Sequence, residues 1–95
     1  MKMRKERYEI LKELLSSLTE EQRQQGIESG ENHYRRFPTM NRKKCIQWGL
    51  YNRASWEFKP QNNGYCFSMY CYDQGLNDNH IYTALKKAIK ELNLL

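Results

Sequence analysis

The side chains in this chain with the clearest capacity for chemistry are cations gathered in one segment. Residues 32–56 contain six Lys and Arg side chains and no Asp or Glu. They are Arg35, Arg36, Arg42, Lys43, Lys44 and Arg53. The whole chain has sixteen Lys and Arg against eleven Asp and Glu, so the remainder holds ten cations against eleven anions and is close to neutral. Because the +5 formal charge arises in one place, we expect an anionic partner there.

Several cations that face one surface bind a nucleic-acid backbone well, since guanidinium groups grip phosphate bidentately. The segment therefore predicts binding of DNA or RNA by a non-enzymatic accessory or regulatory protein. A second interpretation is a small inhibitor or adaptor that docks this patch on an acidic surface of a larger nucleic-acid-processing machine. The plainest interpretation is a solubilising loop, in which Arg35 and Arg36 only match the negative end of a helix dipole.

Tyrosines near the basic segment form a second candidate group. Most of the twelve aromatic side chains lie between Tyr34 and Tyr72. Exposed rings on a sheet can stack on unpaired bases, and Tyr51, Tyr70 and Tyr72 are the rings we expect on a solvent face, because their hydroxyls tolerate water. The alternative is that these residues are there because aromatic side chains favour strands.

Catalytic and metal-binding patterns are weaker. The two histidines, His33 and His80, have no carboxylate or nucleophile that the sequence holds against them. A metal-independent ribonuclease built on His33, Tyr34 and Arg35 is a third possibility, because such chemistry leaves little motif behind. We expect no catalytic site, cofactor or metal.

The three cysteines, Cys45, Cys66 and Cys71, have no CxxC spacing, and a predicted strand would point the last two to opposite faces. An odd number of thiols suits a reducing compartment, so we expect a cytoplasmic protein. The basic start, Met1–Lys5, is not followed by an apolar segment of a secretory signal, and no apolar run is long enough to span a membrane.

Three helices are expected to position these residues. The spacing of Tyr8, Leu11, Leu15 and Leu18 predicts an amphipathic helix over residues 4–18, with Arg7 on its polar face. Its apolar seam could close the core or form a homodimer.

A capping box at Thr19 and Gln22 begins a second helix, which Gly26 and Gly30 weaken and Pro38 stops. Asn77 or Asp78 caps a third helix, which runs to about Asn93.

The segment between the second and third helices predicts a three-stranded antiparallel sheet. Ile46, Trp48 and Leu50 alternate along a first strand, and Trp56 and Phe58 along a second. A turn over 59–64, which ends in Asn-Gly, leads to a third strand over 65–72.

The predicted fold is therefore α+β, a single domain over residues 1–95 with two N-terminal helices, the sheet and a C-terminal helix packed on it. The expected core is Leu11, Leu15, Leu18, Ile46, Trp48, Phe67, Met69, Ile81, Leu85 and Ile89.

Overall fold

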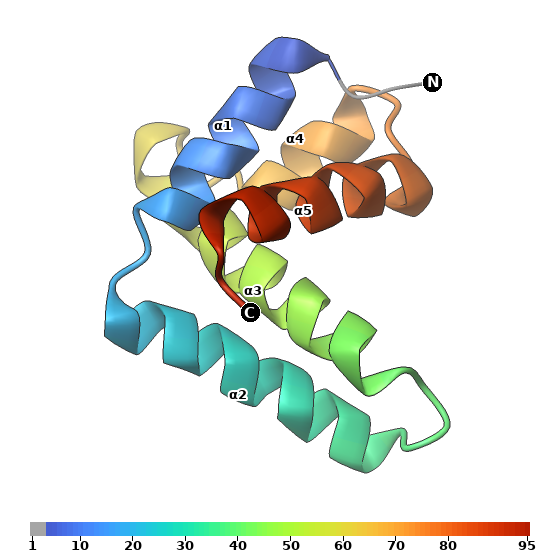
Figure 1. Ribbon diagram of the computed structural model, residues 1–95. Helices are drawn as coiled ribbons and strands as arrows, with labels where there is room; N and C mark the ends of the chain where they lie inside the picture. The colour runs from blue at the N-terminus through green and yellow to red at the C-terminus, as the bar shows by residue number, and fades with distance from the viewer. Residues whose placement is uncertain (1–3) are drawn as a thin grey trace.

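The protein is built from helices. A computed structural model describes residues 4–95, and the first part of the basic N-terminal segment, residues 1–3, lies outside the described residues. The elements are α1 (Lys5–Ser16), α2 (Glu20–Arg36), α3 (Arg42–Glu57), a single 3-10 turn η1 (Lys59–Gln61), α4 (Phe67–Asp73) and α5 (Asp78–Leu92) (Figure 1). The predicted α+β class is wrong, because no residue from 4 to 95 forms a strand.

The first predicted strand lies within α3, and so does the second apart from Phe58, which is the C-cap residue of this helix. Ile46, Leu50 and Ala54 are all buried, and their spacing of four residues places them on one face of a helix. Trp48, which a strand would put on the same face, is only partly buried. The apolar pattern is too short to distinguish the period of a strand from that of a helix. The helix forms because its apolar face packs on the rest of the chain.

The third predicted strand is replaced by α4, a helix of seven residues. Phe67 and Cys71, four residues apart, are fully buried, whereas Met69 between them is 49% exposed. The turn before α4 does contain the expected left-handed residues, Asn63 and Gly64, with φ of 54° and 82°. This turn follows η1 and leads into a helix, and so does not make a hairpin of strands.

The three predicted helices are confirmed as α1, α2 and α5. Thr19 Oγ1 accepts a hydrogen bond from the Gln22 amide at 3.1 Å, and the Gln22 side chain accepts one from the Thr19 amide at 2.9 Å. This capping box begins α2, which runs through both glycines to Arg36. The Asn77 side chain caps α5 by accepting from the His80 amide at 3.0 Å.

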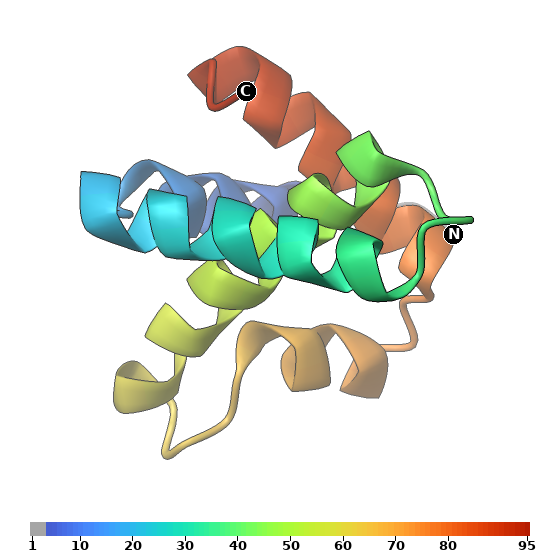
Figure 2. The same ribbon diagram turned by 90° about the horizontal axis from the view of Figure 1, so that it is seen from below.

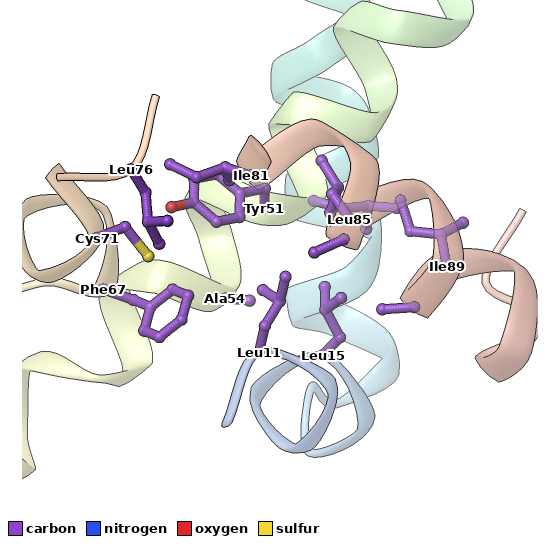
Figure 3. Packing of buried hydrophobic residues seen from close by; sticks show 13 residues of the cluster. Leu11, Leu15, Tyr51, Ala54, Phe67, Cys71, Leu76, Ile81, Leu85 and Ile89 are labelled. Carbon is purple, nitrogen blue, oxygen red and sulfur yellow. The ribbon is translucent and has the colours of Figure 1, made fainter. Parts of the chain in front are cut away.

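One core joins four of the helices. Side chains of α1, α3, α4 and α5 meet in it, with Leu11 and Leu15 facing Ile81, Leu85 and Ile89 across the centre (Figure 3). Seven of the ten expected core residues are buried: Leu11, Leu15, Ile46, Phe67, Ile81, Leu85 and Ile89. Leu18 and Trp48 are partly buried, and Met69 is not in the core. The seam of α1 is therefore used inside the chain.

Helix α2 packs mainly on α3, and the two form an antiparallel hairpin beside the core (Figures 1 and 2). The only buried residues of α2 are Gly26 and Gly30. A Cβ added at Gly30 would lie 2.5 Å from the backbone of Cys45 and Ile46, and one added at Gly49 of α3 would lie 2.2 Å from the Gly26 carbonyl oxygen. The helices thus meet backbone to backbone, which only residues without a side chain allow. None of the helices in residues 4–95 has the length and apolar character needed to cross a membrane.

The predicted position of Arg7 on the polar face of the first helix is also wrong, because this side chain is buried and only 5% exposed. Its Nη2 donates to Gln74 Oε1 at 2.5 Å, and its guanidinium carbon lies 5.9 Å from the centre of the Tyr70 ring. Its Nε is buried without a hydrogen-bond partner, and within residues 4–95 no carboxylate forms a salt bridge with it. A buried cation without a counter-ion costs stability.

We therefore expect Arg7→Met to stabilise the protein. Methionine keeps much of the length and bulk of the side chain and removes the buried charge. The free energy of unfolding should therefore rise by at least about 1 kcal/mol. Urea titration of the two proteins measures this difference. Arg7→Ala is the control, because it removes the charge and also leaves a cavity; a destabilised Arg7→Met would show that the cation contributes favourably where it lies.

Candidate functional site

The turn of the α2–α3 hairpin assembles most of the basic segment. Pro38 cannot continue α2, and the Phe37 amide closes that helix by donating to the His33 carbonyl oxygen at 3.0 Å. The Asn41 side chain then begins α3 by accepting from the Lys44 amide at 2.9 Å. This reversal places the C-terminus of α2 beside the N-terminus of α3 (Figure 1).

Five of the six predicted cations lie at this end of the hairpin, which we call the basic tip. Its members are Arg35, Arg36, Arg42, Lys43 and Lys44. Arg42 Nη2 lies 3.0 Å from Glu31 Oε2, and Arg35 Nη2 lies 4.0 Å from the same oxygen, so these two guanidinium groups are neighbours. With Glu31 as the only acidic residue from 31 to 44, the tip keeps four net positive charges.

Within residues 4–95, no salt bridge joins the remaining cations of the tip to an acidic side chain. The Arg36 guanidinium carbon lies 5.9 Å from the centre of the Phe37 ring, which is 47% exposed. Lys44 Nζ lies 4.9 Å from the centre of the Tyr82 ring. Lys43 is exposed, and in the described part of the chain its side chain makes no hydrogen bond or salt bridge. These charges are therefore free to meet an anion from outside.

Arg53 does not belong to the basic tip. Its Nη1 lies 2.5 Å from Glu57 Oε1, one helical turn along α3, and its Nε donates to Gln25 Oε1 at 3.0 Å. Only 26% of its side chain is exposed. The predicted sheet would leave Arg53 in the turn between its first two strands. Inside α3 this side chain instead joins the two helices of the hairpin.

The helix dipoles have opposite effects on the two groups of cations in the tip. Arg35 and Arg36 lie in the last turn of α2, where cations are favoured. Arg42, Lys43 and Lys44 occupy the first three positions of α3, and no acidic residue is in that first turn. Each cation at the positive end of a helix lowers its stability by about 0.3–1 kcal/mol. Fold stability therefore explains the first pair and does not explain the second group.

The predicted tyrosine platform does not form. Tyr51 is 0% exposed, and burial raises the pKa of its phenol. Tyr70 is partly buried among Phe58 and Phe67. Tyr72 is 50% exposed, and its hydroxyl donates to Asp78 Oδ1 at 2.7 Å; this hydrogen bond and then burial raise its pKa to about 12.

A different aromatic group lies beside the tip. Trp48 and Tyr82 are stacked, with ring centres 5.6 Å apart and planes at 21°. Lys86 Nζ of α5 lies 4.8 Å from the centre of the Tyr82 ring, which is also the ring that Lys44 covers. Lys86 thus extends the positive surface on to α5. The spacing of four residues between Tyr82 and Lys86 is already visible in the predicted C-terminal helix. The position of Lys86 beside the tip is not, because that depends on the stacking of Tyr82 on Trp48 of α3.

A groove of about 620 Å³ runs from the basic tip along the hairpin. Helix α2 contributes Ser29 and His33, and α3 contributes Lys44, Trp48 and Asn52. The lining also includes Met40 and Asn41 near the tip, Tyr72 and Asp78 at the other end, and the glycines of the helix contact, Gly30 and Gly49. No pattern in the sequence predicts this groove, because the groove depends on the packing of α2 on α3 and the sequence predicts strands in place of α3.

The ribonuclease candidates do not converge. His33, Tyr34 and Arg35 are consecutive in α2, so their side chains leave the helix about 100° apart. His33 packs on Phe37, with ring centres 5.0 Å apart, and Arg35 Nη1 donates to Asn32 Oδ1 at 2.6 Å.

No group of three or more side chains that could hold a metal ion occurs in residues 4–95. All three cysteines are free thiols: Cys66 precedes α4 and Cys71 lies inside it, so the predicted opposition across a strand is wrong. Comparisons with protein-family models, curated proteins and solved structures find no match to this chain.

Proposed function

We propose that the protein binds nucleic acid without cleaving it, and that the basic tip contacts the phosphates. One observation carries the proposal: three consecutive cations, Arg42, Lys43 and Lys44, lie at the positive end of α3 with no acidic residue in that turn. Such an arrangement costs stability in the free protein, and a phosphate bound there offsets it.

The shape of the site also supports a backbone contact. Arg35 and Arg36 reach the same end of the hairpin from α2, and Lys86 adds a cation from α5. Exposed arginines suit phosphate because they bind it bidentately, and the turn that carries them protrudes from the helices behind it (Figures 1 and 2). The three free thiols suit a reducing compartment, so we place this activity in the cytoplasm.

The salt dependence of affinity tests the proposal. If four or five cations of the tip displace counter-ions, the slope of log K against log salt concentration should be about −4 on duplex DNA and about −3 on single strands. Fluorescence anisotropy with labelled oligonucleotides, from about 50 to 200 mM salt, measures it. Absence of binding at the lower concentration, or an affinity that salt does not change, would contradict the proposal.

The same surface would suit an acidic protein partner. A pulldown with tagged protein, repeated after nuclease treatment, separates the two classes of partner. Loss of captured material on nuclease treatment is expected here. Protein that stays bound after digestion, together with a flat salt response on oligonucleotides, would favour the adaptor or inhibitor instead.

A further inference from the structure

The groove beside the basic tip is the part of the surface that phosphate binding leaves unexplained. We infer that it accepts an unpaired base, so that the ligand is a single-stranded nucleic acid whose phosphates lie on the tip. This inference rests on the proposed function and adds a strand preference to it. The volume of the groove, about 620 Å³, is within the range of pockets that hold small ligands.

The glycine contact forms the floor of the groove. Gly30 and Gly49 both line it, and they bring the backbones of α2 and α3 together without side chains in between. The floor is therefore backbone, since the facing helix fills the space that a side chain of either glycine would occupy. On the walls, Trp48 offers an aromatic surface and His33 a second ring. Bases stack on such rings whatever their sequence.

The groove also offers polar groups with unused hydrogen-bonding capacity. Asn52 and Ser29 are exposed, and neither side chain makes a hydrogen bond to any other residue from 4 to 95. An amide both donates and accepts, and so does a hydroxyl. The edges of an unpaired base need both kinds of partner, because pairing no longer satisfies them.

Charge fixes the direction in which a strand would lie. Lys44 lines the end near the tip, and the Asp78 carboxylate lies at the other end, where it accepts from the Tyr72 hydroxyl. The anionic end repels phosphate and accepts a neutral base, whereas the cationic end attracts phosphate. A duplex presents its phosphates outside and keeps its bases paired within, so it can satisfy the tip but not the groove.

Intrinsic fluorescence gives a direct test. The chain has two tryptophans, so Trp56→Phe leaves Trp48 in the groove as the only reporter. The probes are oligothymidylate of about ten nucleotides, an abasic phosphodiester of the same length, and a duplex. We expect oligothymidylate to quench Trp48 and to bind at least about fivefold more tightly than the abasic strand, because stacking contributes only to the former.

The outcomes separate this inference from the function on which it rests. If the abasic strand or the duplex binds as tightly as oligothymidylate and Trp48 fluorescence stays unchanged, the tip binds phosphate and the groove is not a base site. If none of the three probes binds, the proposed function itself is wrong. Equal quenching by polyglutamate would make an acidic polypeptide the occupant and would overturn the inference.

A pair of variants checks that the groove is the location. Ser29→Leu should fill it and reduce oligothymidylate affinity to that of the abasic strand, while abasic binding stays unchanged. Gln24→Leu is the matched control, because it is an exposed position of α2 that does not line the groove. Ser29→Leu protein that still prefers oligothymidylate, with an unchanged circular dichroism spectrum, would also overturn the inference.

Discussion

Gly49→Ala is expected to destabilise the protein by about 3 kcal/mol, although it introduces the best helix former into a helix. At an open helical position the same change stabilises by about 1 kcal/mol. At Gly49 the new methyl group would lie 2.2 Å from the Gly26 carbonyl oxygen and 2.8 Å from the Gly30 amide nitrogen. Both are backbone atoms of α2, so no side chain can turn away to make room, and the whole helix must move.

Few apolar contacts besides the glycines hold helix α2 in place. Its buried residues are the two glycines, and Ile27 is only partly buried. Polar links also hold it: Gln22 Nε2 donates to Glu57 Oε1 at 3.2 Å, and Arg23 Nη1 donates to the Leu94 carbonyl oxygen at 3.0 Å. Hydrogen bonds near the surface contribute about 1 kcal/mol each, which is less than the expected clash.

Thermal unfolding followed by far-UV circular dichroism measures the effect. For a domain of this size, a loss of 3 kcal/mol corresponds to a melting temperature lower by about 15 °C. Glu28→Ala, on the exposed side of α2, is the control and should change stability by less than about 0.5 kcal/mol. Gly26→Ala should fall between the two, because its added Cβ meets backbone at 3.1 Å. A Gly49→Ala protein that melts at or above the wild-type temperature would show that the helices are farther apart.

The glycines also show where sequence reasoning reached its limit. Gly26 and Gly30 suggest a weak helix when each residue is judged by its own propensity. Their spacing of four residues puts both on one face, and that face acquires a meaning only once Gly49 is known to be helical. Small residues at this spacing allow two helices to approach closely. Propensity is local, whereas the reason for these residues lies in a partner helix far along the chain.

The predicted sheet failed for a related reason. In short segments such as 44–50 and 65–72, apolar residues two and four apart fit either a strand or a helix, and aromatic residues favour the strand. Met69 distinguishes the two, since a strand buries it with Phe67 and a helix exposes it. The helices with caps, by contrast, were predictable, because Thr19 and Asn77 satisfy backbone groups within a few residues of themselves.

The site was predictable in its charges and not in its surroundings. Pro38 marks a chain reversal, so the grouping of the cations on either side of it could be foreseen. The predicted binding roles of Arg53 and of the tyrosines depended on a sheet. Because the sheet does not form, these side chains do not lie where the prediction needs them. Lys86 and the groove required the packing of α5 and α2 on α3, which no local pattern contains.

Two charge reversals at the basic tip are expected to have opposite effects on folding and the same effect on binding. Lys43→Glu places an acidic residue in the first turn of α3, where the helix dipole favours it, so stability should rise by about 0.5 kcal/mol or more. Arg36→Glu places one in the last turn of α2, where the dipole disfavours it, so stability should fall by a similar amount.

Both reversals remove a cation that has no acidic partner in the described part of the chain, so each should weaken nucleic-acid binding by at least about tenfold near 0.1 M salt. The double variant should lose about 100-fold or more, and its salt slope should fall by about 2 on duplex DNA. Anisotropy titrations and urea unfolding of the same preparations measure the two quantities side by side. A loss of affinity in the more stable Lys43→Glu protein cannot be attributed to unfolding.

Lys5→Glu supplies the matched control for Lys43→Glu. It is the same substitution in the first turn of another helix, α1, whose start lies at the opposite end of the molecule from the α2–α3 turn (Figure 1). The dipole should make it stabilising as well, while binding should change by less than about threefold, because only the net charge differs. If Lys5→Glu weakens binding as strongly as Lys43→Glu does, affinity depends on the overall charge of the protein and the basic tip has no special part in it. If instead only the tip variants lose affinity, the cations that oppose the dipole of α3 are there for a ligand, since they make the free fold less stable.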